Sequence, residues 1–127
     1  MVNTNYSVGN FLVRVKNAAM AGNKTLTMGS NKYVFGVAEA LKKLGYFDDV
    51  KKEGNEITVS LSFKDKHPKL IDLKLVSKPG LRVYMGVDEL SQKKGPSIYL
   101  LSTPKGIVSS KNAIKDRVGG EVIAEIW

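Results

Sequence analysis

The sequence of 127 residues contains no cysteine and only one histidine, His67. Without thiols the chain can form neither disulfides nor a cysteine-ligated zinc site, and one imidazole is too few for the usual transition-metal ligand sets. His67 stands in a polar, turn-like stretch with Asp65, Lys66 and Pro68, where a solvated histidine is expected. The sequence therefore predicts no metal and no cofactor.

The chain also lacks long hydrophobic runs. No apolar stretch approaches the roughly 20 residues that a membrane-spanning helix needs. The basic side chains do not line one face of a long amphipathic helix, which is the usual pattern of a membrane-surface segment. We therefore expect no membrane partner and a cytoplasmic location.

Catalytic side chains in useful combinations are missing as well. The acidic pairs Asp48-Asp49 and Asp88-Glu89 are adjacent in sequence, so in a strand their side chains would diverge rather than share a proton. Glycine-rich phosphate loops have no match, because Gly106 stands alone and Gly119-Gly120 precedes a strand-like segment. We expect that the chain is not an enzyme. The alternative is a small phosphate- or nucleotide-binding enzyme that uses residues 102–106 as its anion loop.

Positive charge is what the chain has in excess. Lysine and arginine number 20 against 12 acidic residues, for a formal net charge of +8. A domain this basic usually has a polyanionic partner, most often a nucleic acid. Residues 1–76 contain twelve basic and seven acidic side chains, and residues 77–127 contain eight basic and five acidic ones. Charge thus indicates a nucleic-acid partner without assigning its site to either half.

Apolar residues at helical spacing predict two helices in the first half. One stripe runs from Val8 to Ala19, with Ser7 as the N-cap and Gly22 after the end. A short strand over residues 25–28 should follow. The second helix is predicted to begin after the N-cap Asn31 and to end at Gly45, with a stripe formed by Val34, Val37, Ala38, Leu41 and Leu44.

After Gly45 the hydrophobic period changes to two, which predicts strands. Residues 47–52 and 57–63 flank a hairpin connection at 53–56, and a third strand follows at 71–75. In the second strand Ile57, Val59, Leu61 and Phe63 should face the core. One face of this sheet needs cover, which the two amphipathic helices can supply.

Ser77-Lys78-Pro79-Gly80 interrupts the alternation and marks the expected boundary between lobes 1–76 and 77–127. The second lobe should contain strands near 81–85, 97–101 and 121–127, a polar turn at 88–95 and a short helix near 110–117. The predicted fold class is α+β, with an N-terminal α-β-α-β-β-β lobe and a mainly β C-terminal lobe with one short helix.

The segment Ser102-Thr103-Pro104-Lys105-Gly106 joins an apolar strand to the short helix. Its hydroxyls and its lysine suit phosphates, sugar hydroxyls and base edges. A proline stiffens such a loop, a glycine permits close approach, and short polar side chains fit the shallow minor groove of RNA. The residues alone leave a binding loop and a plain strand-to-helix turn equally open.

Four strings in this order, "NFLVRVKNA" (10–18), "SKPGLRVY" (77–84), "STPKG" (102–106) and "GGEVIAEIW" (119–127), resemble the bacterial small-subunit ribosomal protein number eight family. The likeness spans essentially the whole chain. It implies a structural constituent of the ribosome with a two-lobed α+β fold. It also implies primary binding to a helix in the central domain of the small-subunit rRNA, early in assembly. The implied partners are that rRNA, neighbouring small-subunit proteins and, for some members, the messenger RNA of the protein's own operon.

The resemblance places the RNA-binding residues in the second lobe. The family's contact loop, usually Ser-Thr-Ser-Lys/X-Gly, maps to residues 102–106, with Pro104 in place of the second serine. Tyr84 matches an aromatic of the RNA surface, and Glu121 matches a position that braces the loop. At the first helix the family's Asp-Pro and further Asp are replaced by Tyr6, Ser7 and Asn10, a change that concerns capping. The implied RNA-binding set is Lys78, Arg82, Tyr84, Ser102, Thr103, Pro104, Lys105, Gly106 and Glu121.

Overall fold

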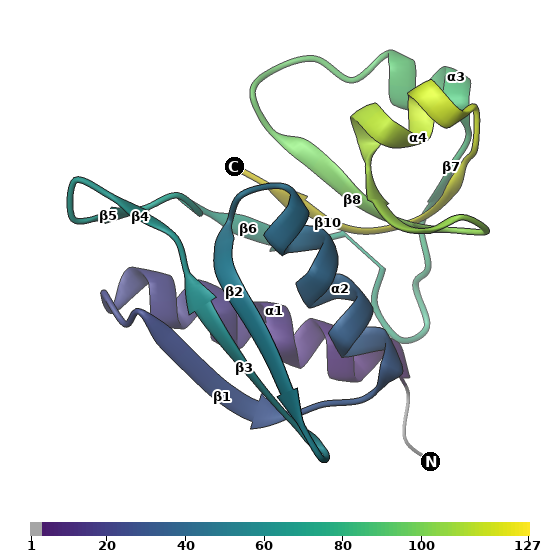
Figure 1. Ribbon diagram of the computed structural model, residues 1–127. Coiled ribbons are helices and arrows are strands. Elements are labelled where there is room, and N and C mark those ends of the chain that lie inside the picture. Colours follow the sequence, from purple (N-terminus) through teal and green to yellow (C-terminus); the bar gives the residue numbers. More distant parts are fainter. Residues whose placement is uncertain (1–3) are drawn as a thin grey trace. The chain divides into compact units, whose positions relative to one another are not determined.

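The computed structural model describes the backbone of residues 4–127 and the side chains from Ser7 onward. The chain divides into two compact units, of which one ends at Ile71 and the other comprises Asp72–Trp127. Each unit packs helices on an antiparallel sheet (Figure 1). The predicted α+β fold class is confirmed.

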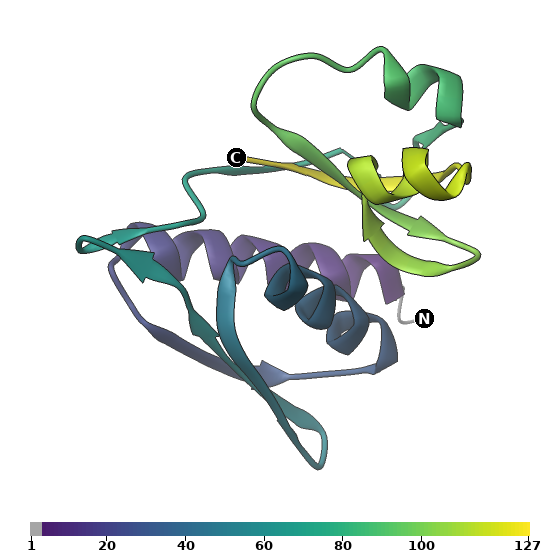
Figure 2. The same cartoon turned by 45° about the horizontal axis from the view of Figure 1, so that its top comes forward.

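The first unit contains two helices and a three-stranded sheet. Its main elements are α1 (Thr4–Met20), β1 (Thr25–Gly29), α2 (Lys32–Lys43), β2 (Phe47–Glu53) and β3 (Glu56–Leu61). The strands lie in the order β1-β3-β2, and Figure 2 shows both helices on one side of them. Gly54 begins the two-residue turn between β2 and β3 with φ 58°, in the left-handed region that glycine favours.

The predicted helical stripes form the core of this unit. The Phe11 ring meets the Phe47 ring edge-on, with centroids 6.3 Å apart. The Oδ1 atom of Asn31 accepts hydrogen bonds from the backbone N–H groups of Tyr33 and Val34, so the predicted N-cap of α2 is confirmed. Side chains with no more than 1% exposure include Phe11, Leu12, Val15, Val34, Val37, Ala38, Leu41, Ile57 and Val59.

The prediction that Ser7 caps the first helix is wrong. Helix α1 begins at Thr4, so Ser7 lies inside the helix. Serine costs a helix interior only a few tenths of a kcal/mol relative to the best helix formers, which is too little to stop the helix one turn early. Asn10 is an exposed helical residue, and the side chain of Tyr6 lies outside the described residues.

The predicted C-terminal end of the strand over 57–63 is wrong. Strand β3 stops at Leu61, and a short separate hairpin follows, formed by β4 (Phe63–Lys64) and β5 (His67–Pro68). The backbone N–H of the buried Ser62 donates to the carbonyl of Tyr46, the residue before β2, and the pairing with β2 ends there. Phe63 therefore leaves the core face of β3 and is only half-buried.

The strand predicted at 71–75 belongs to the other unit. Strand β6 (Leu73–Leu75) pairs with β10 (Gly120–Ile126), Leu75 lying opposite Ala124. This pairing moves the boundary from residues 76/77 to residues 71/72. Ile71, the first residue of the strand predicted at 71–75, is outside β6 and is 77% exposed. Alternation predicts a strand but not the sheet that it joins, because that choice depends on contacts distant in sequence.

The second unit is built around β10. Its remaining elements are β7 (Tyr84–Met85), α3 (Val87–Ser91), β8 (Ile98–Thr103), β9 (Gly106–Ser109) and α4 (Ser110–Asp116). The sheet order is β6-β10-β8-β9, and β7 pairs with the beginning of β10. Leu90 of α3 and Ala113 of α4 pack with Leu101 and Val122 of the sheet.

Two short helices therefore stand where one was predicted. Helix α3 replaces the first part of the polar turn expected at 88–95. Its apolar residue Leu90 is 1% exposed, and the Gly86 N–H donates to Oε1 of Glu89 at 3.3 Å. One buried leucine and this capping contact hold a helix whose sequence is otherwise polar.

We expect the fragment 77–127 to be less stable than the fragment 72–127. The longer fragment keeps β6, whose Leu73 is 3% exposed and whose backbone pairs with β10. Burial of one leucine side chain contributes about 1.5–3 kcal/mol, and loss of β6 also opens an edge of the sheet. Urea unfolding followed by circular dichroism measures the difference. Equal midpoints for the two fragments would contradict the assignment of β6 to this unit.

Candidate RNA interface

The segment 102–106 forms a β-hairpin, not the strand-to-helix connection expected from the sequence. Thr103 at the end of β8 pairs with Gly106 at the start of β9, and α4 begins only after β9. Pro104 and Lys105 occupy the exposed tip. Gly106 has φ 110°, which L side chains rarely adopt. The hairpin thus presents a short polar tip at the end of two strands.

The two hydroxyls of this hairpin have different surroundings. Thr103 Oγ1 donates to the Gly106 carbonyl at 2.8 Å and accepts from the Lys105 N–H at 3.1 Å. Its hydroxyl is therefore engaged in holding the turn. Ser102 is half-buried, and within the described residues its hydroxyl makes no hydrogen bond. The Ser102 hydroxyl can therefore donate a hydrogen bond to a binding partner or accept one from it.

Three predicted site residues lie in one row across the sheet. Glu121 of β10 stands opposite Tyr84 of β7 on one side and opposite Ser102 of β8 on the other. Directly opposed residues point to the same face, and neighbouring strands lie about 4.8 Å apart. Helices α3 and α4 cover the opposite face, where Leu101 and Val122 lie. Tyr84 is 65% exposed, which excludes a core tyrosine.

Two basic residues of the predicted set flank this row. Arg82 Nη1 lies 3.2 Å from Glu121 Oε2, with side-chain exposures of 25% and 15%. The Ser77 hydroxyl accepts from the N–H of Val83 at 2.9 Å and donates to its carbonyl at 3.2 Å. These bonds close the base of the loop that carries the exposed Lys78. Arg82 is thus tied to the sheet, whereas Lys78 faces solvent.

Gly119 and Gly120 allow a close approach of strands. Neither has the positive φ of a glycine-dependent turn, so the backbone conformation is not what requires glycine here. A Cβ at Gly120 would stand 2.1 Å from the carbonyl oxygen of Ser102, and one at Gly119 would stand 2.5 Å from that of Met85. Any side chain here would push β10 away from the strands that carry Ser102 and Tyr84.

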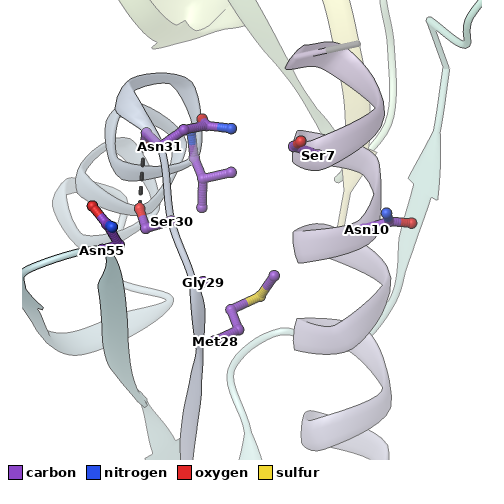
Figure 3. Close-up of a pocket in the computed structure, with 8 residues that line it drawn as sticks. Ser7, Asn10, Met28, Gly29, Ser30, Asn31 and Asn55 are labelled. Atoms are coloured by element: carbon purple, nitrogen blue, oxygen red, sulfur yellow. Dashed lines mark hydrogen bonds between the residues drawn. The ribbon is translucent and has the colours of Figure 1, made fainter. Parts of the chain in front are cut away.

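The first unit contains a polar hollow that the sequence did not reveal. Its volume is about 440 Å³, and its lining residues are Ser7, Asn10, Met28, Gly29, Ser30, Asn31, Val34 and Asn55. Figure 3 shows Ser7 and Asn10 on α1 and, across from them, Ser30 and Asn31 where β1 leads into α2. The Ser30 hydroxyl donates to the Asn31 carbonyl at 3.2 Å. No acidic side chain lines the hollow. The asparagines are far apart in sequence, so only the fold brings them together.

A metal-binding arrangement is not found in residues 7–127, the part with described side chains. No group of three or more histidine, cysteine or acidic side chains there could hold a metal ion. Among the described helices none is long and apolar enough to cross a membrane. His67 is exposed at the β4–β5 hairpin, as the sequence predicted.

Replacing Pro104 with Ser tests how the hairpin tip contacts its partner. We expect a stability loss of about 0.4–1 kcal/mol, because serine leaves the unfolded chain freer than proline does. We expect a few-fold gain in affinity for the cognate RNA, because the Thr103 hydroxyl still holds the turn while a hydroxyl and an N–H are added. Pro104→Ala, which restores the N–H alone, is the control. Weaker binding by Pro104→Ser would show that stiffness matters more than the added donors.

The fold and this surface define a class of protein: a basic α+β protein of two units, with an aromatic and two polar residues in one row on the sheet of the second unit. The chain belongs to the ribosomal protein S8 family, whose model matches residues 7–127. A relative from Spiroplasma kunkelii, the small ribosomal subunit protein uS8, is 41% identical over 95% of this chain and 97% of its own length. The protein of the same name from Chloroflexus aggregans is 37% identical over 99% of this chain and all of its own length.

Membership in this family confirms the resemblance stated from the sequence. The protein has a structural, non-enzymatic role in the small ribosomal subunit, and RNA binding and participation in translation follow from the family. The expected place in the small ribosomal subunit agrees with the names of these relatives. The alternative of a phosphate-handling enzyme is thereby removed.

Proposed function

We propose that the protein is a primary rRNA-binding protein that holds a helix in the central domain of the small-subunit rRNA and assists subunit assembly. The observation that supports this best is the row of Tyr84, Glu121 and Ser102 across three strands, beside the exposed tip of the β8–β9 hairpin. Such a row offers an aromatic ring, a carboxylate and a hydroxyl on one rigid surface. A rigid polar surface of this kind suits the shallow minor groove of an RNA helix.

Each residue of the surface has a distinct chemical task in this proposal. The unengaged Ser102 hydroxyl bonds a 2′-hydroxyl or a base edge, and the exposed Tyr84 ring lies against a base or a sugar. Lys105 and Lys78, both exposed, attract phosphates over a longer range. Thr103, Gly106 and the Arg82–Glu121 pair hold the contacting groups in place.

The hollow of the first unit supports a second contact with the same rRNA. Its amides and hydroxyls donate and accept hydrogen bonds, and the exposed Arg14 lines the adjoining surface with Asn10. Neighbouring small-subunit proteins and a messenger RNA fold of the protein's own operon are further proposed partners. Both units are basic, so neither is excluded from RNA by its charge.

Binding of a central-domain rRNA fragment, compared with binding of mononucleotides, tests this proposal. Filter binding with the fragment and calorimetry with mononucleotides are carried out at the same salt concentration. The proposal predicts tight binding of the fragment, weaker binding of an unrelated RNA helix and no saturable mononucleotide binding. Equal affinity for the fragment and the unrelated helix would contradict specific recognition.

A further inference from the structure

The β4–β5 hairpin is an exposed basic projection that neither the core nor the proposed interface uses. Residues 63–69 contain three lysines against one aspartate, and Lys64, Lys66 and Lys69 are all exposed. Among the described residues none of the three makes an ion pair, although Asp65 lies between two of them. Figures 1 and 2 show the hairpin continuing beyond the end of β3 at the outer end of the first unit. The hairpin therefore carries an excess of positive charge.

The base of this hairpin is firmly held. The Lys69 N–H donates to the Ser62 carbonyl at 2.9 Å, and the Ser62 N–H donates to Tyr46 at the same distance. Ser62 and Leu70, on either side of the hairpin, are only 5% and 3% exposed. The two strands add the pairs Phe63–Pro68 and Lys64–His67. The lysines are thus presented on a fixed arm.

The tip of the hairpin has an unfavourable backbone conformation. Asp65 and Lys66 form its two-residue turn with φ 52° and 69°, where hairpin turns usually carry asparagine, aspartate or glycine. Aspartate tolerates this region, whereas a lysine is uncommon in it. Backbone strain of this kind is concentrated at binding sites. Glycine at position 66 would make the turn more stable, yet the chain carries a cation there.

We propose that the β4–β5 hairpin is a further RNA contact, separate from the sheet surface and from the hollow, in which Lys64, Lys66 and Lys69 bind backbone phosphates without reading sequence. Lysine ammonium groups bind phosphates as point charges, and short fixed arms of this kind position a protein on RNA. This inference rests on the proposed function, because the partner in both cases is RNA. It concerns a different surface, in the first unit, with its own variants.

A triple variant measures the contribution of the hairpin to phosphate binding. Lys64→Gln, Lys66→Gln and Lys69→Gln are combined and compared with the combination of Lys94→Gln, Lys111→Gln and Lys115→Gln, which removes the same charge from exposed lysines of the second unit. With the central-domain rRNA fragment, the slope of log affinity against log salt should become less negative by about 2–3 in the hairpin variant, since each phosphate contact contributes about −0.7 to −0.9. An equal change in the control variant would show an effect of net charge and overturn the proposal.

Two glycine substitutions separate charge from shape. Lys66→Gly removes strain and a cation together, so we expect a higher melting temperature and a shallower salt slope. Asp65→Gly relaxes the same turn but removes an anion, so RNA binding should stay equal or become stronger. Weaker binding by both variants would mean that turn shape, not charge, makes the contact. If neither variant alters binding, the hairpin is a solvated projection and the proposal is wrong.

The absence of cysteine permits a direct localisation. A Lys66→Cys variant has a single thiol, to which an iron chelate that releases hydroxyl radicals is attached in the reconstituted small subunit. The proposal predicts strand cleavage confined to one rRNA segment, and Lys111→Cys should give a different pattern or none. Cleavage of a neighbouring protein without rRNA cleavage would identify a protein partner instead and overturn the proposal. If the wild-type protein bound no rRNA, the proposed function would fail, and the hairpin variants would then be compared on an unrelated RNA duplex.

Discussion

Replacing Gly120 with Ala is expected to destabilise the protein by about 3 kcal/mol, at the upper end of the usual cost of overpacking. The added Cβ would stand 2.1 Å from the Ser102 carbonyl oxygen, and the backbone, unlike a flexible side chain, cannot move aside cheaply. Strands β8 and β10 would separate where the proposed RNA surface lies, so affinity for the rRNA fragment should fall as well. Denaturant unfolding and filter binding measure the two effects.

Gly29→Ala is the matched control for the stability effect of this substitution. Its Cβ would meet nothing within 4 Å, and Gly29 is not at positive φ. We expect the control to change the free energy of unfolding by less than about 1 kcal/mol. If Gly120→Ala were no more destabilising than Gly29→Ala, the close approach of β8 and β10 would not be what requires glycine at this position.

Replacing Glu121 with Ala should cost about 2 kcal/mol of stability. The carboxylate lies 3.2 Å from the Arg82 guanidinium, and both side chains are largely shielded from water. Removing one partner of a shielded pair leaves the other charge poorly solvated, which costs more than the pair itself contributes. Because Arg82 lies in the segment that leads into β7 and Tyr84, we also expect weaker binding of the rRNA fragment.

A double variant separates the ion pair from the cost of an unpaired charge. Arg82→Met combined with Glu121→Leu removes both charges and should be more stable than Glu121→Ala alone. Thermal unfolding of Arg82→Met, Glu121→Leu and the double variant completes the cycle. Additive losses in the double variant would mean that the two side chains do not interact.

The sequence predicted those parts of the fold that depend on local pattern. Both helical stripes, the Asn31 cap and the hairpin at Gly54 follow from residues close together in the chain, and the structure confirms them. The predictions for residues 71–75 and 87–91 failed because contacts with residues distant in sequence decide their structure. Strand β6 pairs with β10 rather than with β3. The otherwise polar segment at 87–91 forms a helix because Leu90 packs into the core of the second unit.

The candidate site was predicted as a set of residues but not as an arrangement. Resemblance to a family supplied Tyr84, Ser102 and Glu121, whereas only strand register shows that they lie in one row. The sequence does not distinguish the engaged hydroxyl of Thr103 from that of Ser102, because the difference depends on the turn geometry. The role of the site residues stays a prediction until binding is measured.

Binding of cognate and unrelated RNA by Ser102→Ala and Lys105→Gln tests the central claim most directly. Ser102→Ala should lose about 1–2 kcal/mol of binding free energy on the central-domain fragment, a typical cost of an unpaired polar contact, and little on an unrelated RNA helix. Lys105→Gln should weaken both RNAs alike and flatten their salt dependence. If Ser102→Ala weakened both RNAs equally, or neither, the β8–β9 hairpin would be a plain turn and the proposed interface would be wrong.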